Sequence, residues 1–136
     1  SDFELSEVEL MTLSESREDY LENPLILETR SGGFVRQVDM ASRMGFSKAS
    51  ISKAMSSLSA EGYVEFRPRG LVRLSNGGRK IAERVYDRHC FFFKVLTNLG
   101  IPTEIAQRDA CRMEHAMSEE SYQALKKELS SKMDVQ

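Results

Sequence analysis

The chain has 136 residues, of which 40% are hydrophobic, enough for one compact domain or two small domains that share a core. No stretch reaches the apolar length of a membrane span, and residues 1–11 are acidic where a secretory signal would be basic and then apolar. Two cysteines are too few for a disulfide framework. We therefore expect a cytoplasmic protein with reduced thiols and no membrane partner.

The net charge of −2 conceals an uneven distribution of charge along the chain. Residues 30–80 contain ten Lys or Arg side chains against three acidic ones, whereas residues 1–29 contain nine acidic side chains and one Arg. A basic segment between acidic flanks indicates a module that binds a polyanion.

A first helix is predicted after an N-terminal tail over residues 1–13. Either of two capping boxes can start it, Thr12 with Glu15 or Ser16 with Asp19. Pro24 should kink or break this helix, because proline removes a backbone hydrogen bond and clashes with the preceding turn. A turn at Ser31-Gly32-Gly33 follows.

Residues 34–62 predict a helix, a tight turn and a second helix. The first helix is predicted from apolar residues at helical spacing, Val35, Val38, Ala41 and Met44. Gly45 can adopt the positive φ of a turn, and Ser47 can cap the second helix. The inward positions of that second helix are Ile51, Met55 and Leu58.

The outer face of the second helix is unusual in carrying short hydroxyl side chains and two lysines without any acid. Its members are Lys48, Ala49, Ser50, Ser52, Lys53, Ser56 and Ser57. A helix that is merely solvated would normally include glutamates, whereas this face can enter a major groove and contact base edges and phosphates. We therefore predict a recognition helix.

Residues 63–74 predict a β-hairpin, because two alternating segments flank Pro68-Arg69-Gly70. The side chains expected to face the helices are Val64, Phe66, Val72 and Leu74. Arg67, Arg69 and Arg73 would project as a wing that contacts phosphates beside the groove. A helix-turn-helix followed by such a wing is a moderately specific signal of DNA binding.

Three further helices are predicted after a turn at Asn76-Gly77-Gly78. The first runs to about Leu99, includes His89, and has an apolar stripe of Ile81, Val85, Phe92, Leu96 and Leu99. The second begins at Pro102 and Thr103, and the third runs from a cap at Ser118 to about Lys132. Because one neighbouring helix cannot cover all of Phe91, Phe92 and Phe93, we expect a second subunit.

Six side chains suggest a metal site. Cys111, Glu114 and His115 are three and four residues apart and can share one helical face. A thiolate, a carboxylate and an imidazole together suit a divalent transition metal. The other candidate ligands, far upstream, are Asp19, Glu22 and His89. Each residue singly also fits an ordinary role, as a buried thiol, a helix-start acid or a core histidine, so the prediction depends on the whole set.

Five motifs together are far more specific than any one of them: residues 18–22 (EDYLE), 46–53 (FSKASISK), 61–64 (EGYV), 88–89 (RH) and 110–117 (ACRMEHAM). On these motifs the chain resembles, over about residues 16–132, the metal-dependent regulators typified by the diphtheria toxin repressor and the manganese transport regulator. The resemblance implies a homodimer that binds a palindromic operator once a metal corepressor is bound, usually repressing metal-uptake genes.

The resemblance also implies the fold, which is mainly α with a small β-hairpin. A winged helix-turn-helix over residues 14–75 would precede an all-α dimerisation and metal-binding domain over residues 76–136. This is the two-domain manganese type, without the small barrel that many iron-type members append. Such a protein is not an enzyme and has no small organic substrate.

The implied metal ligands combine two branches of this family. Asp19 and Glu22 resemble first-helix ligands of manganese-type members. The cluster of Cys111, Glu114 and His115 resembles that of iron-type members, and His89 matches a ligand position in both. Fe²⁺ or Mn²⁺ is the expected corepressor, and Zn²⁺, Co²⁺ or Ni²⁺ can bind in vitro. An iron-type ancillary site would need ligands at Phe93 and Gln107, so we expect it to be absent.

The implied DNA contacts lie on the recognition helix and the wing. By resemblance, the residues that approach bases are Ser47, Ala49, Ser50 and Lys53, and those that contact phosphate are Arg67 and Arg69. Arg36, Lys48 and Ser52 complete the predicted interface.

Two other functions remain open from the residues. A redox-sensing winged-helix regulator would use Cys111 or Cys90 as its reactive thiol, but would leave Glu114, His115 and His89 as coincidences. A metal-dependent hydrolase could activate water on an ion held by the same ligands, but would leave the recognition helix and wing unexplained.

Overall fold

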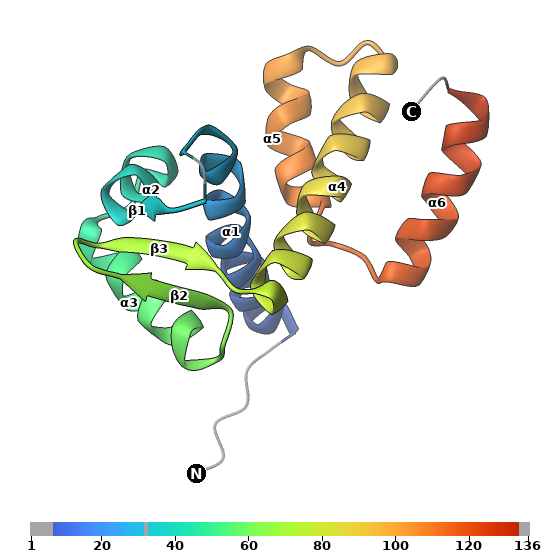
Figure 1. The fold of residues 1–136 in the computed structure, drawn as a ribbon. Helices are drawn as coiled ribbons and strands as arrows, with labels where there is room; N and C mark the ends of the chain where they lie inside the picture. The colour runs from blue at the N-terminus through green and yellow to red at the C-terminus, as the bar shows by residue number, and fades with distance from the viewer. Residues whose placement is uncertain (1–6, 32, 134–136) are drawn as a thin grey trace. The chain divides into compact units, whose positions relative to one another are not determined.

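The computed structural model describes residues 7–31 and 33–133, which form two compact units, Ser1–Glu83 and Arg84–Gln136 (Figure 1). The elements are α1 (Glu7–Ser31), β1 (Val35–Arg36), α2 (Gln37–Met44), α3 (Lys48–Ala60), β2 (Val64–Arg67), β3 (Leu71–Leu74), α4 (Asn76–Asn98), α5 (Thr103–Met113) and α6 (Glu119–Lys132). The predicted fold class, mainly α with a small sheet, is confirmed. Among the described residues, no helix is long and apolar enough to cross a membrane.

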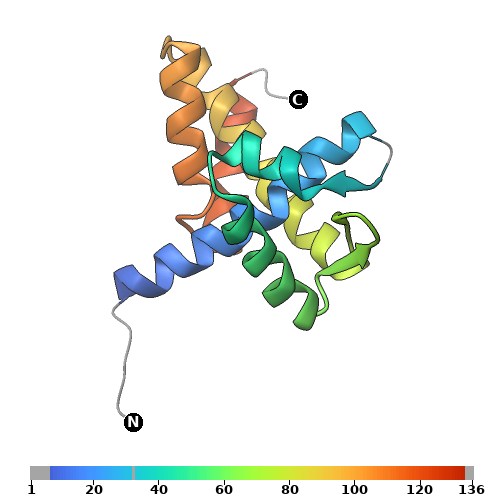
Figure 2. The ribbon, with the colours of Figure 1, turned by 90° about the vertical axis from the view of Figure 1, so that its left-hand side faces the viewer.

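The predicted helix-turn-helix is present as α2 and α3, joined by a short connection (Figure 2). Gly45 ends α2 with a φ of 71°, and Ser47 caps α3 because its hydroxyl oxygen accepts a hydrogen bond of 3.1 Å from the backbone N–H of Ser50. The three predicted inward residues of α3 are buried: Ile51, Met55 and Leu58. Val38, assigned to the apolar face of α2, is instead 41% exposed.

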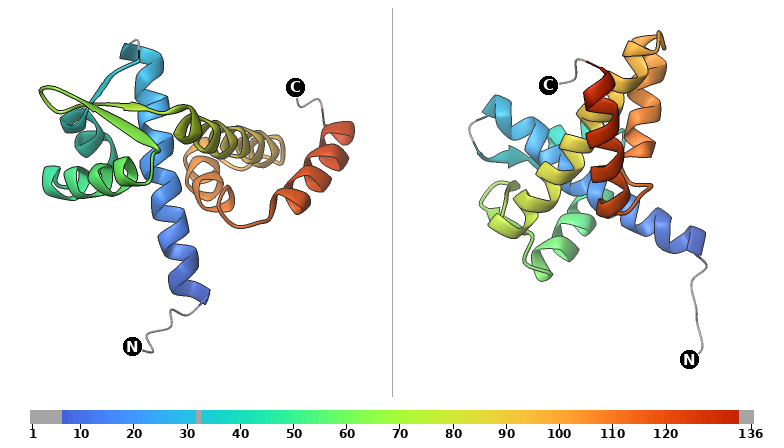
Figure 3. Two further views of the ribbon diagram at one scale, coloured as in Figure 1. Left: turned by 60° about the horizontal axis from the view of Figure 1, so that its bottom comes forward. Right: turned by 90° about the vertical axis from the view of Figure 1, so that its right-hand side faces the viewer.

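The predicted hairpin belongs to a three-stranded antiparallel sheet with the order β1-β3-β2 (Figure 3). β3 pairs with β2 in the register Val64↔Leu74, and with β1 in the register Val35↔Val72. The assignment of Val35 to a helix was therefore wrong. A strand of two residues has no alternation to recognise, and only its pairing with β3 defines it.

The tip of the hairpin lies in solvent, since residues 66–70 are all exposed. Phe66, expected to face the helices, is 41% exposed. Arg73, expected to project from the wing, instead pairs across the strands with Glu65 at 2.6 Å and lies over the ring of Phe34. The cross-strand pair forms because Glu65 and Arg73 are directly opposite each other in the register.

Helix α1 begins earlier than predicted and continues through Pro24 without a break. Both predicted capping boxes lie inside the helix, since it starts at Glu7. Pro24 and Leu21 are buried, and the side-chain amide of Asn23 donates a hydrogen bond of 2.8 Å to the carbonyl of Asp19. Packing of this turn into the core thus outweighs the hydrogen bond that proline removes.

Asn76-Gly77-Gly78, predicted as a turn, forms the first turn of α4. The hydroxyl of Ser75 accepts a hydrogen bond of 3.1 Å from the N–H of Gly78, as an N-cap does. Gly78 packs against the backbone so closely that an added Cβ would lie 2.0 Å from the carbonyl oxygen of Tyr63. The absence of a side chain at Gly78 therefore lets the start of α4 pack directly against the backbone of Tyr63, the residue before β2.

The second unit consists of the rest of α4 with α5 and α6, and its core is aromatic. Phe91 is 4% exposed and Phe92 is 2% exposed, because Tyr122 of α6 packs on both rings, edge-on to Phe91 at 5.7 Å between centroids. One chain thus buries Phe91 and Phe92, whereas Phe93 stays only partly buried within it. Leu99, assigned to the apolar stripe, is 70% exposed.

Gly78→Ala should destabilise the first unit by about 1–3 kcal/mol or more, because its Cβ must displace backbone at Tyr63. Gly77→Ala is the matched control, since its Cβ would meet no atom closer than 3.8 Å. Alanine is a better helix former than glycine by up to about 1 kcal/mol, so this control should be neutral or stabilising. Urea unfolding of both variants measures the difference, and equal midpoints would contradict the close-packing argument.

Candidate functional site

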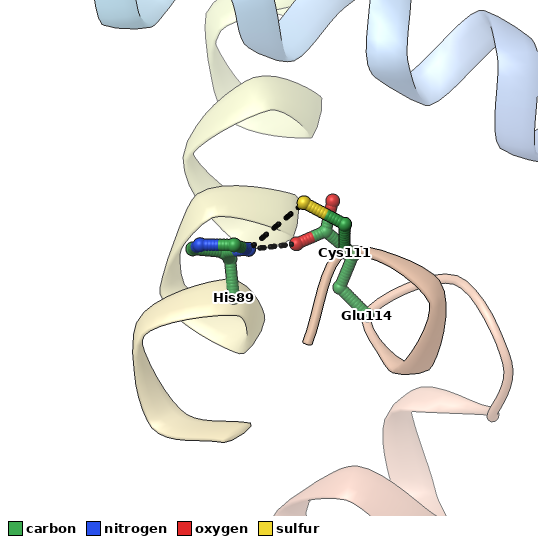
Figure 4. A group of neighbouring side chains, drawn as sticks. All are labelled: His89, Cys111 and Glu114. Carbon is green, nitrogen blue, oxygen red and sulfur yellow. Dashed lines mark hydrogen bonds and ion pairs between the residues drawn. The ribbon is translucent and has the colours of Figure 1, made fainter. Parts of the chain in front are cut away.

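His89, Cys111 and Glu114 converge in the second unit. α4 carries His89, α5 carries Cys111, and Glu114 directly follows α5 as its C-cap (Figure 4). His89 Nδ1 lies 2.9 Å from Glu114 Oε2 and 3.7 Å from Cys111 Sγ. One donor atom from each residue lies within 4.8 Å of the other two. The site thus joins residues 25 positions apart in the chain.

The end of α5 sets the arrangement of its three candidate ligands. The N–H of Glu114 still bonds to the carbonyl of Ala110, at 3.0 Å, so Cys111 and Glu114 share a helical face as predicted. His115 lies beyond the helix, in a tighter turn in which its N–H bonds to the carbonyl of Arg112 at 3.4 Å. Its Nε2 nevertheless lies 3.2 Å from Glu114 Oε1.

Glu114 is a buried carboxylate whose side chain has no exposed surface. Its Oε2 faces His89, while its Oε1 accepts no hydrogen bond from the described residues. Burying a charged group is costly unless a cation or hydrogen-bond donors compensate it. An imidazole near each oxygen leaves this carboxylate well placed to bind a cation.

The surroundings of His89 favour its protonated form. Its hydrogen bonds, first with Cys111 and second with Glu114, raise the pKa of His89 to about 10 against the opposing effect of burial. In the metal-free site a proton on the imidazole thus supplies the positive charge between a sulfur and a carboxylate.

The donor atoms of this cluster fit a divalent transition metal. Imidazole nitrogen, cysteine sulfur and carboxylate oxygen are the ligands that such ions take in proteins, and a metal would replace the His89 proton as the central cation. Glu114 Oε1 is buried and accepts no hydrogen bond from the described residues, so it is a further available metal-ligand atom.

The two upstream candidates, Asp19 and Glu22, belong to the first unit. Both lie on α1, three residues apart, and Glu22 is 5% exposed. Phe93, at a position where an ancillary site would need a ligand, packs against the aromatic core of the second unit instead.

The predicted recognition face of α3 is in solvent. All of its members are exposed, and exposed Ser47 precedes them: Lys48, Ala49, Ser50, Ser52, Lys53, Ser56 and Ser57. Arg69 is exposed at the hairpin tip with a left-handed φ of 67°, unusual for a residue with a side chain. Arg36 is exposed and forms a bidentate ion pair with Asp39, with N–O distances of 2.9 and 3.1 Å.

Phe34 is a residue of this surface that the sequence reasoning missed. Two arginines of the hairpin lie over its ring, with the guanidinium carbon of Arg67 at 5.6 Å and that of Arg73 at 5.1 Å from the ring centre. Such contacts are cation–π interactions. The signal in the sequence was an aromatic residue directly after two consecutive glycines, in a segment rich in arginine.

In the metal-free protein, the imidazole of His89 should titrate with a pKa of about 10 rather than 6.5. Because this pKa is raised in the folded state, the protonated imidazole contributes stability fully below pH 6.5, and the contribution is lost as pH rises through about 10. Ring chemical shifts of His89 measured by NMR from about pH 5 to about pH 11 give the midpoint. Cys111→Ser and Glu114→Gln should each lower it, and a native midpoint near 6.5 would contradict the proton-bridged site.

Comparisons with known proteins match both units. Residues 12–72 match the iron-dependent repressor N-terminal DNA-binding domain, and residues 75–132 match the iron-dependent repressor metal-binding and dimerisation domain. The chain is similar to the transcriptional regulator MntR of Escherichia coli, with 40% identity over 111 residues that cover 80% of this chain and 70% of that protein. Its similarity to MntR of Salmonella typhimurium is 38% over 109 residues, covering 79% and 68%.

A solved structure has the same fold. It is a manganese-dependent transcriptional repressor in complex with manganese, with 26% identity and a TM-score of 0.71. The match covers 84% of this chain and 52% of that one, so this chain spans about half the length of that repressor. With both of its domains matched in order, the chain belongs to the iron-dependent repressor family of metal-dependent, DNA-binding transcriptional regulators.

Proposed function

We propose that this protein is a homodimeric repressor of metal-uptake genes that binds DNA when Fe²⁺ or Mn²⁺ is bound. The observation that carries the proposal is the convergence of His89, Cys111 and Glu114, with one donor atom each within 4.8 Å of the others. His115 approaches the second oxygen of Glu114. Asp19 and Glu22 are proposed as further oxygen ligands on the family resemblance.

The proposed DNA interface consists of the exposed face of α3 with its N-cap, the hairpin tip and Arg36 of β1. Its residues are Arg36, Ser47, Lys48, Ala49, Ser50, Ser52, Lys53, Arg67 and Arg69. Two features support it: the α3 face carries lysines and hydroxyls without an acid, and Phe34 holds Arg67 beside the strands. A regulator of this kind works on the chromosome, so we place the protein in the cytoplasm.

The residues of the site have distinct tasks in this proposal. His89, Cys111 and Glu114 would hold the metal, which would supply a fixed positive charge in place of the His89 proton. Glu114 neutralises that charge from a buried position, and Cys111 contributes the one soft ligand. Metal binding would then favour the dimer conformation whose two α3 helices match successive half-sites of a palindromic operator.

The metal requirement is tested with DNA duplexes selected from a random pool by Mn²⁺-loaded protein. EDTA should weaken binding of these duplexes by about 5- to 150-fold, the usual range of allosteric coupling, and added Mn²⁺ or anaerobic Fe²⁺ should restore it. Glu114→Gln should lose the metal response. Glu120→Gln, which removes an exposed acid of α6 outside the cluster, should keep it. Equal affinity with and without EDTA would overturn the corepressor model.

The Cys111–His89 contact favours a second candidate, a regulator that senses oxidants through its thiol. Cys111 is exposed, so an oxidant can reach its sulfur, and that sulfur lies 3.7 Å from His89 Nδ1. The two candidates differ in their response to reagents. A thiol sensor would respond to peroxide and reductant in the presence of EDTA, whereas the metal sensor would respond to EDTA in the presence of reductant. The hydrolase alternative finds no support, because the family consists of DNA-binding regulators.

Cys111→Glu should shift the metal preference of DNA binding toward Mn²⁺. Thiolate favours Fe²⁺ over Mn²⁺, while a carboxylate accepts either ion, so the change replaces the one soft donor with a hard one. Activation is the required readout, since Zn²⁺, Co²⁺ and Ni²⁺ can bind more tightly without being physiological. Anaerobic DNA-binding curves against free Fe²⁺ and Mn²⁺ give the ratio, with Cys90→Ser, a second exposed thiol outside the cluster, as control. An unchanged ratio would make Cys111 a packing residue.

A further inference from the structure

Arg88 is a buried cation directly before His89 on α4, with 6% of its surface exposed. Its Nη1 donates hydrogen bonds to two main-chain carbonyls, that of Glu114 at 3.2 Å and that of Met117 at 2.7 Å. Its Nη2 bonds to a carboxylate oxygen of Glu119 at 2.9 Å. The guanidinium also lies over the ring of Tyr122, 4.9 Å from its centre.

These contacts hold the segment that connects α5 to α6, residues 114–118. α5 ends at Met113, so the carbonyls beyond it have no helical partners of their own. A cation at the C-terminal end of a helix also complements the helix dipole. One side chain of α4 thus fixes the backbone at Glu114 and again at Met117, on both sides of His115.

Two consecutive residues of α4 therefore hold Glu114 at opposite ends. His89 contacts its carboxylate at 2.9 Å, and Arg88 contacts its main-chain carbonyl at 3.2 Å. A metal bound to the Glu114 carboxylate would replace the hydrogen bond between His89 and Glu114. The hydrogen bond from Arg88 would remain, because it is made to the main-chain carbonyl and not to a proposed ligand atom. The backbone anchor of Glu114 can thus persist in both states of the site.

Burial of the charged Arg88 side chain has a free-energy cost that an apolar side chain at the same position would not have. Its Nε has no hydrogen-bond partner among the described residues, and a buried unpaired donor costs about 1–3 kcal/mol. Replacing a buried ionic group by an apolar one of similar volume is often neutral or stabilising. The arrangement is better explained by the geometry that Arg88 imposes on residues 114–117.

The geometry points to Arg88 as a positioning residue of the metal site, one that holds Glu114 and His115 ready for the ion without touching it. This inference rests on the proposed function, because it takes the His89, Cys111 and Glu114 cluster as the metal site. Residues that orient metal ligands typically change affinity by about 10- to 100-fold when they are altered. The same range is expected here.

The test is a Co²⁺ titration of the full chain, with Co²⁺ absorption bands as the readout and unfolding of the metal-free protein measured in parallel. Arg88→Met should weaken Co²⁺ binding by about 10- to 100-fold and change the spectrum. Arg88→Lys keeps the charge but not the planar fork, so its affinity should fall between those of the native protein and Arg88→Met. Lys126→Gln is the matched control: it removes the 3.0 Å ion pair with Asp87 and the contact over Tyr122, and leaves the carbonyls of residues 114–117 untouched.

The outcomes separate this inference from the proposed function. If both Arg88 variants bind Co²⁺ with native affinity and spectrum at a temperature where they are folded, Arg88 does not position the site, whatever happens to the unfolding midpoint. The Lys variant provides this comparison even if the Met variant fails to fold. If the native chain shows no Co²⁺ spectrum that depends on Cys111, the proposed metal site fails, and the role of Arg88 fails with it.

Discussion

The buried carboxylate of Glu114 is the constraint around which the second unit is organised. With no exposed surface on its side chain, its charge must be compensated within the protein. In the metal-free state the compensation comes from His89, whose pKa the cluster raises to about 10. The same requirement makes the position attractive to a divalent ion, because a bound ion would supply the compensating positive charge in place of the His89 proton.

The polar network behind this site has a supporting role. Arg88 ties the backbone after α5 to α4, and Tyr122 donates a hydrogen bond of 2.6 Å to Asp87, one residue before Arg88. The ring of Tyr122 packs at the same time on Phe91 and Phe92. Three consecutive residues of α4, Asp87, Arg88 and His89, thus contact α6, the segment after α5 and the candidate metal cluster, respectively. Ligand geometry and core packing are therefore coupled in this unit.

The first unit shows why some elements could be predicted and others could not. α3 was predicted correctly because its signals are local: a glycine with positive φ, a serine cap and inward residues at helical spacing. β1 was missed because it exists only through its pairing with β3. The start of α4 was read as a turn because the two glycines looked like chain breakers. Their actual role depends on the carbonyl of Tyr63, which packs against Gly78.

The features of the candidate site also fall into those that the sequence predicted and those that it did not. The sequence by itself determined the types of donor atom and placed Cys111 and Glu114 on one face, since a spacing of three is a property of any α-helix. Only the tertiary structure decided that His89 joins them, that His115 follows the end of the helix, and that Glu114 is buried, because these depend on how α4 packs against α5 and where α5 ends. The spacing of residues on one helix follows from local backbone geometry, whereas the burial of Glu114 and the convergence of the three side chains depend on contacts between segments that are distant in the chain.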